Sequence, residues 1–119
     1  RAWLYSRIDT RFAQMVNEDG GTTEANALLA RNISPDLPLM RAIGMPHFYD
    51  LAAGKPSVNM DHVISLSQRD TRRYAKRQMT WFRNQMDHWP RLDPMIWQQR
   101  PDKMLKDLNQ IAQELEKQG

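Results

Sequence analysis

The sequence predicts an all-α fold, with at most one short strand near Arg91 to Ile96. Three observations predict it. Apolar residues recur three and four positions apart along several stretches, and capping residues, Gly or Pro mark where those stretches end. One stretch is also long enough for a helix of about 40 Å at 1.5 Å per residue.

Length and composition describe one domain, or a piece of one. The chain has 119 residues, of which 40% are apolar and 26% charged. It has no Cys, which excludes disulfides, thiolate metal sites and cysteine catalysis. No apolar run approaches the roughly 18 residues of a membrane span and no signal peptide is recognisable, so we expect no membrane association and a cytoplasmic location. Because the chain opens at Arg1 within a helical pattern, we expect a fragment.

The first two helices are predicted on either side of a glycine pair. Apolar residues repeat at helical spacing from Trp3 to about Val16, and Gly20-Gly21 supplies the stop. Thr22 or Thr23 is expected to cap a second helix that runs through about Arg31. The two prolines between residues 32 and 38 then indicate a loop.

A short third helix is predicted from Pro46 to Ala53, because Pro suits a first helical turn and Gly54 lies just beyond the end. Arg41 to Met45 then forms the approach to this helix. Free backbone N–H groups in that approach, together with Arg41, are one candidate phosphate site. A plain turn is the alternative reading of the same residues.

The longest helix is predicted from Met60 to about Asp87, capped by Asn59. Its buried side is expected to carry Val63, Ile64, Tyr74, Phe82 and Met86. The sequence His88-Trp89-Pro90 ends it, and Arg91 to Ile96 is expected to be extended or a short edge strand. A last helix begins at Pro101-Asp102, and we expect no internal linker. The apolar residues predicted to face inward on it are Met104, Leu105, Leu108, Ile111, Ala112 and Leu115.

A basic stretch from Arg69 to Arg83 dominates the long helix. Its fifteen residues hold six cations and one anion, a net charge of +5, whereas the whole chain carries +3. At 100° per residue, one arc of about 120° contains Arg69, Arg72, Arg73, Lys76, Thr80 and Arg83. The other side contains Ala75, Met79, Trp81, Phe82 and Met86. One face therefore suits a polyanion and the other a protein core.

Two interpretations of the basic arc stay open from the residues alone. It is either a solvated helix face whose long stems cover apolar neighbours, or a surface that binds phosphates. The second is favoured, because six cations on a few turns repel one another unless an anion lies beside them. Tyr74 and Trp81 either stack on bases or pack in the core, and their place opposite the arc favours the core.

Catalytic motifs are missing from the sequence. His47, His62 and His88 do not share a metal-ligand spacing, and no phosphate-binding loop of the G-x-x-x-x-G-K-[ST] type occurs. Ser and Thr residues lack a plausible neighbouring base. From the residues alone, the chain is a basic helical module that binds nucleic acid or phosphate and has no catalytic residues or metal ligands of its own.

The stretch TRRYAKRQMTWFR, residues 71 to 83, resembles the signature of tRNA dimethylallyltransferases, also called tRNA isopentenyltransferases. Two weaker matches precede it in the family's order. RIDTRFAQM, residues 7 to 15, resembles an Arg-Ile-Asp-x-Arg-x-x-x-Met helix. RAIG, residues 41 to 44, followed by a Leu-x-x-Gly at 51 to 54, resembles an Ile-Gly segment. Together the matches span residues 7 to 83.

The resemblance implies transfer of a dimethylallyl group from dimethylallyl diphosphate to N6 of the adenosine next to the anticodon of tRNA. It also implies a P-loop-type α/β core of the ATP-binding kind, which lies in the N-terminal half of such enzymes and is absent here. The whole chain, residues 1 to 119, would then be a C-terminal helical portion that packs on that core. Mg²⁺ is expected for the complete enzyme but not bound by this chain alone.

Carried over residue by residue, the resemblance assigns tRNA contacts to two segments. The first consists of Arg41, Ala42, Ile43, Gly44, Met45 and Pro46. The second consists of Lys76, Arg77, Gln78, Met79, Thr80, Trp81, Phe82 and Arg83. The sequence departs from the family at two of these positions, since the family usually has Tyr and a basic residue where Met45 and Pro46 stand.

Three arginines are candidates to face the diphosphate: Arg7, Arg11 and Arg72. For Arg7 and Arg11, ion pairs with Asp9 or other acids are an equal alternative. Two rival functions also stay open. One is a non-enzymatic basic module that binds RNA or DNA unaided, and the other is a helix bundle whose basic face meets an acidic protein partner.

Overall fold

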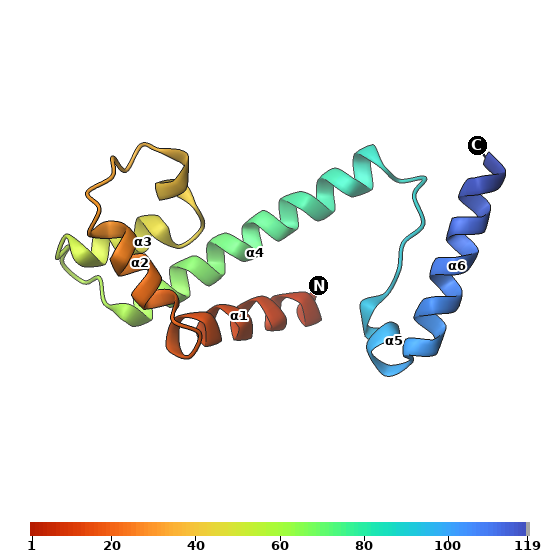
Figure 1. Cartoon of the computed structure of the whole chain (residues 1–119), viewed down its shortest axis with the longest axis horizontal. Coiled ribbons are helices and arrows are strands. Elements are labelled where there is room, and N and C mark those ends of the chain that lie inside the picture. Colours follow the sequence, from red (N-terminus) through yellow and green to blue (C-terminus); the bar gives the residue numbers. More distant parts are fainter. Residues whose placement is uncertain (119) are drawn as a thin grey trace. The chain divides into compact units, whose positions relative to one another are not determined.

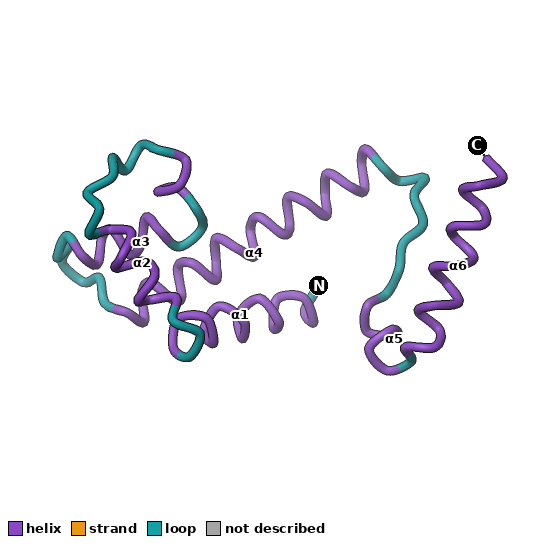
Figure 2. Tube along the Cα trace, in the orientation of Figure 1, coloured by secondary structure: helices purple, strands orange, loops and turns teal. Residues whose placement is uncertain are grey.

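The computed structural model describes residues 1–118, which are helical or in connecting loops (Figures 1 and 2). No strand occurs among these residues, so the all-α prediction is confirmed. The elements in chain order are α1 (Ala2–Asn17), α2 (Gly21–Leu29), the 3₁₀ helix η1 (Pro38–Arg41), α3 (Met45–Ala52), α4 (Met60–Gln85), α5 (Pro94–Gln99) and α6 (Pro101–Gln118). None of these helices has both the length and the apolar content that a membrane span requires.

The chain divides into two compact units, the first from Arg1 to Trp81 and the second from Phe82 onward. We expected no internal boundary, because the helical pattern runs through this point without interruption. The boundary lies inside α4, whose backbone is continuous from Met60 to Gln85. Helical periodicity is a local property and does not report which neighbours a helix has.

The first unit has a small apolar core drawn from four helices. Its buried members are Phe12, Val16, Ala25, Phe48 and Val63. Within this unit, α1 runs alongside the first part of α4 (Figure 1), and Gln68 of α4 donates a hydrogen bond to the backbone carbonyl of Asp9 at 2.8 Å. The core therefore gathers around the N-terminal part of the long helix.

The turn between α1 and α2 differs from its prediction. We expected Thr22 or Thr23 to cap α2, but the N-cap is Gly20, with φ of 78°. Thr22 instead donates its hydroxyl to the carbonyl of Val16 at 3.1 Å, which ties α2 to the end of α1. A Cβ on Gly21 would lie 2.7 Å from the carbonyl oxygen of Met15, so a larger residue would force this turn open.

Helices α3 and α4 begin close to where the sequence predicts. Pro46 lies in the first turn of α3. Asn59 caps α4, since its side-chain oxygen accepts the N–H of His62 at 3.0 Å. On α4, Val63 is fully buried as expected, but Tyr74 and Phe82 are each 48% exposed, so their predicted burial is wrong. Spacing along one helix cannot specify how far along it other helices pack.

The second unit contains a helix that the sequence analysis missed. Residues 94 to 99 form α5, so an extended segment through Ile96 is wrong and only residues 91 to 93 are non-helical. Asp93 caps α5 by accepting the N–H of Met95 at 2.9 Å. Between α5 and α6, the indole of Trp97 donates to Asp107 at 3.2 Å. The pair Asp93-Pro94, which we predicted to be extended, is therefore the start of a helix.

Helix α6 begins at Pro101, as predicted, but its apolar side is largely open. Leu105 and Leu115 are about three-fifths exposed and Leu108 is 43% exposed. Met104 and Ile111 are half-buried. The predicted inward orientation therefore holds only in part among the residues that the structure describes.

Candidate nucleic-acid interface

Two cations of the basic arc on α4 are neutralised within the fold. Arg69 donates to the carboxylate of Asp70 at 3.0 Å, and Arg72 forms an ion pair with Asp9 of α1. Both arginines are partly buried. A carboxylate therefore already balances each of these two charges, and the Arg72 pair also links α4 to α1.

Three other cations on the same unit's part of α4, namely Arg73, Lys76 and Arg77, are exposed. We call them the basic face. Across residues 1–118, no carboxylate lies within 4.0 Å of their charged groups. Arg77 does have a ring contact, because its guanidinium carbon lies 6.0 Å from the centre of the Tyr74 ring. The basic face is therefore open to an anion from outside.

The three arginines predicted to face a diphosphate differ in their contacts, and Asp9 pairs with one of them. Its carboxylate pairs with Arg72, and among the described residues it pairs with neither Arg7 nor Arg11. Arg7 lies with its guanidinium carbon 5.3 Å from the ring centre of Trp3. Arg11 is exposed and lines a shallow hollow together with Ile43 and other residues. Arg11 is thus the least engaged of the three.

His47 of α3 and Asp70 of α4 form a second link to the long helix. The histidine Nε2 and a carboxylate oxygen of Asp70 are 2.7 Å apart. Partial burial acts to raise the pKa of Asp70, but the hydrogen bonds with His47 and Arg69 outweigh it, so this pKa lies below the ordinary value of 3.8. Sequence spacing gave no sign of this pair, because its members are 23 residues apart.

The segment from Arg41 to Pro46 is held in place by Gly44. This residue is buried, with φ of +94°, and a Cβ there would lie 3.3 Å from the Phe12 ring and from the Ser67 hydroxyl oxygen. A left-handed backbone and two close neighbours both favour glycine. Gly44 therefore lets the backbone of this segment approach α1 and α4 closely.

Two backbone donors of this segment are used within the turn. The N–H of Met45 donates to the carbonyl of Ala42 at 2.9 Å, and that of Ala42 donates to Leu39 at 3.3 Å. These donors are engaged within the turn and cannot also point at an anion. Arg41 is exposed and lies 4.0 Å from Asp36, which is also exposed. Among the described residues, the N–H groups of Ile43 and Gly44 donate no backbone hydrogen bond, so a phosphate site at these two donors stays a prediction.

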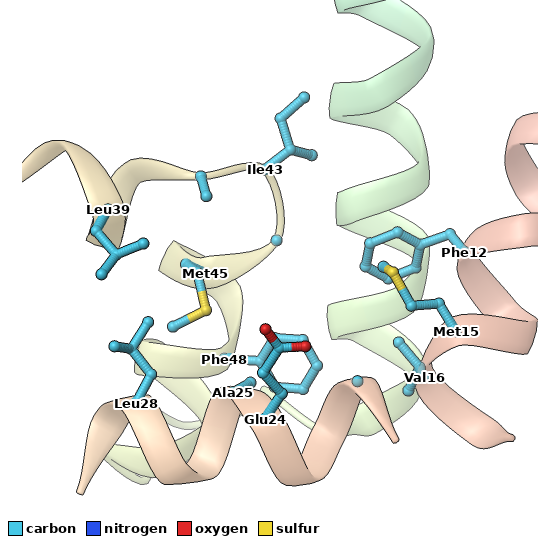
Figure 3. A pocket seen from close by; sticks show the side chains of 13 residues that line it. Phe12, Met15, Val16, Glu24, Ala25, Leu28, Leu39, Ile43, Met45 and Phe48 are labelled. Atoms are coloured by element: carbon cyan, nitrogen blue, oxygen red, sulfur yellow. The ribbon is translucent and has the colours of Figure 1, made fainter. Parts of the chain in front are cut away.

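Residues 42 to 45 also line an apolar hollow of about 190 Å³ (Figure 3). The view shows Ile43 and Met45 on one side, Leu28 and Glu24 of α2 on another, and Phe12 of α1 on a third. No cation lines it, and Glu24 is its one charged residue. A hollow with this lining would repel a diphosphate.

The second segment predicted to contact tRNA lies further along α4. Gln78 and Thr80 are exposed, Met79 is half-buried and Trp81 is 51% exposed. The Thr80 hydroxyl donates to the carbonyl of Lys76 at 3.0 Å. The last two residues assigned to this segment, Phe82 and Arg83, belong to the second unit and are exposed.

The first segment lies beside a part of α4 that precedes the second segment. Gly44 approaches Ser67, and Ile43 lines one hollow together with Thr71. Lys76 lies five residues beyond Thr71, about 7.5 Å further along the helix axis.

Nowhere in residues 1–118 do three or more His, Cys, Asp or Glu side chains gather as a metal site would need.

Comparison with known proteins identifies the family. A sequence model described as IPP transferase matches residues 1–85. Over 95 residues, the chain is 48% identical to a tRNA dimethylallyltransferase of Allorhizobium ampelinum, covering 79% of this chain and 30% of that protein. It is 47% identical over 92 residues to a tRNA dimethylallyltransferase of Phenylobacterium zucineum, covering 77% and 29%.

The chain thus spans about 30% of the length of these relatives. No solved structure matches it. The match to the family model covers the whole first unit, including the basic face and the Gly44 turn. On these grounds the chain belongs to the IPP transferase family.

Proposed function

We propose that this chain works as part of a tRNA dimethylallyltransferase and supplies contacts to the tRNA. The complete enzyme would transfer a dimethylallyl group from dimethylallyl diphosphate to N6 of the adenosine next to the anticodon. Family membership and the name carried by the relatives support this proposal. A cytoplasmic location belongs to the same proposal.

The observation that carries the tRNA-binding role is the contrast among the cations of α4. Arg69 and Arg72 have acidic partners, whereas Arg73, Lys76 and Arg77 have none within 4.0 Å among residues 1–118. Each Lys or Arg that neutralises a phosphate releases a condensed counterion, so exposed cations of this kind bind a nucleic-acid backbone without reading its sequence.

The chemistry would be divided between this chain and the rest of the enzyme. The target adenine has to leave its stack to be alkylated, which costs a few kcal/mol, and backbone contacts hold the tRNA while it does. The departing diphosphate gains negative charge that cations stabilise. Arg11 is the best-placed candidate of this chain for that contact, because Arg72 is paired with Asp9 and Arg7 lies against Trp3.

The remaining parts are proposed to lie outside this chain. These are the phosphate-binding core, the catalytic base and any Mg²⁺, whose role would be to balance charge on the diphosphate. The described acidic side chains do not cluster as that ion requires, so we assign no residue of this chain to it.

A chimaera tests the proposal. In the Allorhizobium ampelinum relative, the matching 95-residue segment is replaced by this chain's segment, and incorporation of radiolabelled dimethylallyl groups into tRNA is measured. We expect the chimaera to transfer the group and the relative lacking that segment to be inactive. A folded chimaera that binds tRNA and dimethylallyl diphosphate but transfers nothing would favour the non-enzymatic RNA-binding module instead.

A further inference from the structure

We propose that Tyr74 and Arg77 together form a stacking platform for one unpaired base of an RNA strand whose phosphates bind Arg73 and Lys76. This inference rests on the proposed function and adds a specific contact to it. It also changes the prediction made for Tyr74, which the sequence placed in the core.

The exposure of Tyr74 is the first argument. Its side chain is 48% exposed, although the aromatic residues of a small domain are usually needed in its core. Arg77, one turn further along α4, holds its guanidinium carbon 6.0 Å from the ring centre. This distance is at the outer limit of a cation–π contact, and the ring keeps much of its surface open to solvent.

The position of the pair relative to the basic face is the second argument. At 100° per residue, Arg77 lies on the helix surface between Arg73 on one side and Tyr74 on the other. Trp81, seven residues after Tyr74, lies on the same strip and is 51% exposed. A row of cations beside a row of aromatic rings is the arrangement that single-stranded nucleic acids require, because the phosphates and the bases are bound side by side.

The surrounding charges do not oppose an anionic strand. Asp70 is the acid nearest to Tyr74 in sequence on this side of α4, and its carboxylate is already bonded to Arg69 and His47. Its negative charge is thus balanced within the fold. A single RNA strand would use both kinds of group at once, with its phosphates on the cations and a base on the ring. An acidic protein surface would need only the cations, and an apolar one only the ring.

The test compares single-stranded and duplex RNA binding to the full 119-residue chain. The probes are an oligoadenylate with one 2-aminopurine and an RNA duplex of the same length, with dissociation constants measured by fluorescence. For Tyr74→Leu we expect at least about fivefold weaker binding of the single strand, little change for the duplex and loss of the 2-aminopurine quenching. Tyr74→Phe should keep all three properties.

Tyr49→Leu is the matched control, because Tyr49 is a tyrosine of similar exposure, 40%, on α3. It should bind both probes as the parent does. Far-ultraviolet circular dichroism checks that each variant is folded. If folded Tyr74→Leu binds and quenches the single strand like the parent, the platform is wrong. A change in oligomeric state for Tyr74→Leu, without a change in RNA binding, would assign this surface to protein contacts and would also overturn it.

A separate variant distinguishes this failure from failure of the proposed function. Arg73→Ala with Lys76→Ala should weaken binding of both RNAs, because phosphates are common to both. If this double variant loses affinity while Tyr74→Leu does not, the basic face binds RNA and the stacking platform does not exist. If neither variant changes the affinity for either RNA, both proposals fail.

Discussion

Asp9 of α1 pairs with Arg72 of α4, and this ion pair joins the two helices that carry the family's first and last sequence matches. Because Arg72 is paired with this carboxylate, it is not available to an external anion. The backbone carbonyl of Asp9 also accepts from Gln68, so one residue of α1 holds two successive turns of α4. The helix that presents the basic face is positioned by an acid 63 residues away.

Asp9→Ala is expected to destabilise the first unit by about 1 kcal/mol, since the pair is only partly exposed and its loss leaves Arg72 without a partner. Urea unfolding followed by circular dichroism measures the change in free energy. Asp36→Ala is the matched control, because Asp36 lies 4.0 Å from Arg41 and both are well exposed. Equal losses for the two variants would contradict a structural role for Asp9.

Gly44→Ala should cost about 1 to 3 kcal/mol of unfolding free energy. The alanine would have to adopt the positive φ of this position, and its Cβ would lie 3.3 Å from both Phe12 and Ser67. Gly54→Ala separates these two causes, because Gly54 also has a positive φ, +71°, but no atom within 4 Å of a Cβ. We expect Gly54→Ala to be clearly the milder variant in the same urea experiment, and a reversed order would refute the close packing at Gly44.

Stability is expected to fall as the pH drops below about 4, in part through Asp70. The folded state lowers the pKa of this carboxyl below its ordinary value of 3.8, so the stabilisation is present above that value and is lost as the pH falls through the folded pKa. Asp70→Asn should be less stable than the parent at pH 6, and the difference should shrink towards pH 3. Urea titrations across this range test it, and a constant difference would be inconsistent with the lowered pKa.

Removing two cations of the basic face should weaken tRNA binding and reduce its salt dependence. For Arg73→Ala with Lys76→Ala, we expect the slope of log affinity against log salt to shrink by about 1.4 to 1.8, or 0.7 to 0.9 per phosphate contact. Fluorescence anisotropy with an anticodon stem-loop measures it at several salt concentrations. Arg31→Ala with Lys106→Ala removes the same charge from two other exposed sites and should leave the slope nearly unchanged.

Much of the local structure was predictable because its causes are local. The spacing of apolar residues located α1 and α4, Asn59 located the start of α4, and Pro101 located the start of α6. The basic arc was also visible, because charge and helical angle are both read along one chain. The motif of residues 71 to 83 pointed to the family that the comparisons identify.

Only the tertiary structure decided which polar and charged groups have partners within the fold. It paired Arg72 with Asp9 and Asp70 with His47, engaged the backbone donors at Ala42 and Met45, and left Tyr74 exposed beside Arg77. Each outcome depends on contacts between residues that periodicity along one helix does not relate, or on the absence of such a contact. A helical pattern determines which side chains share a face, whereas packing against other helices determines which faces stay open to a ligand.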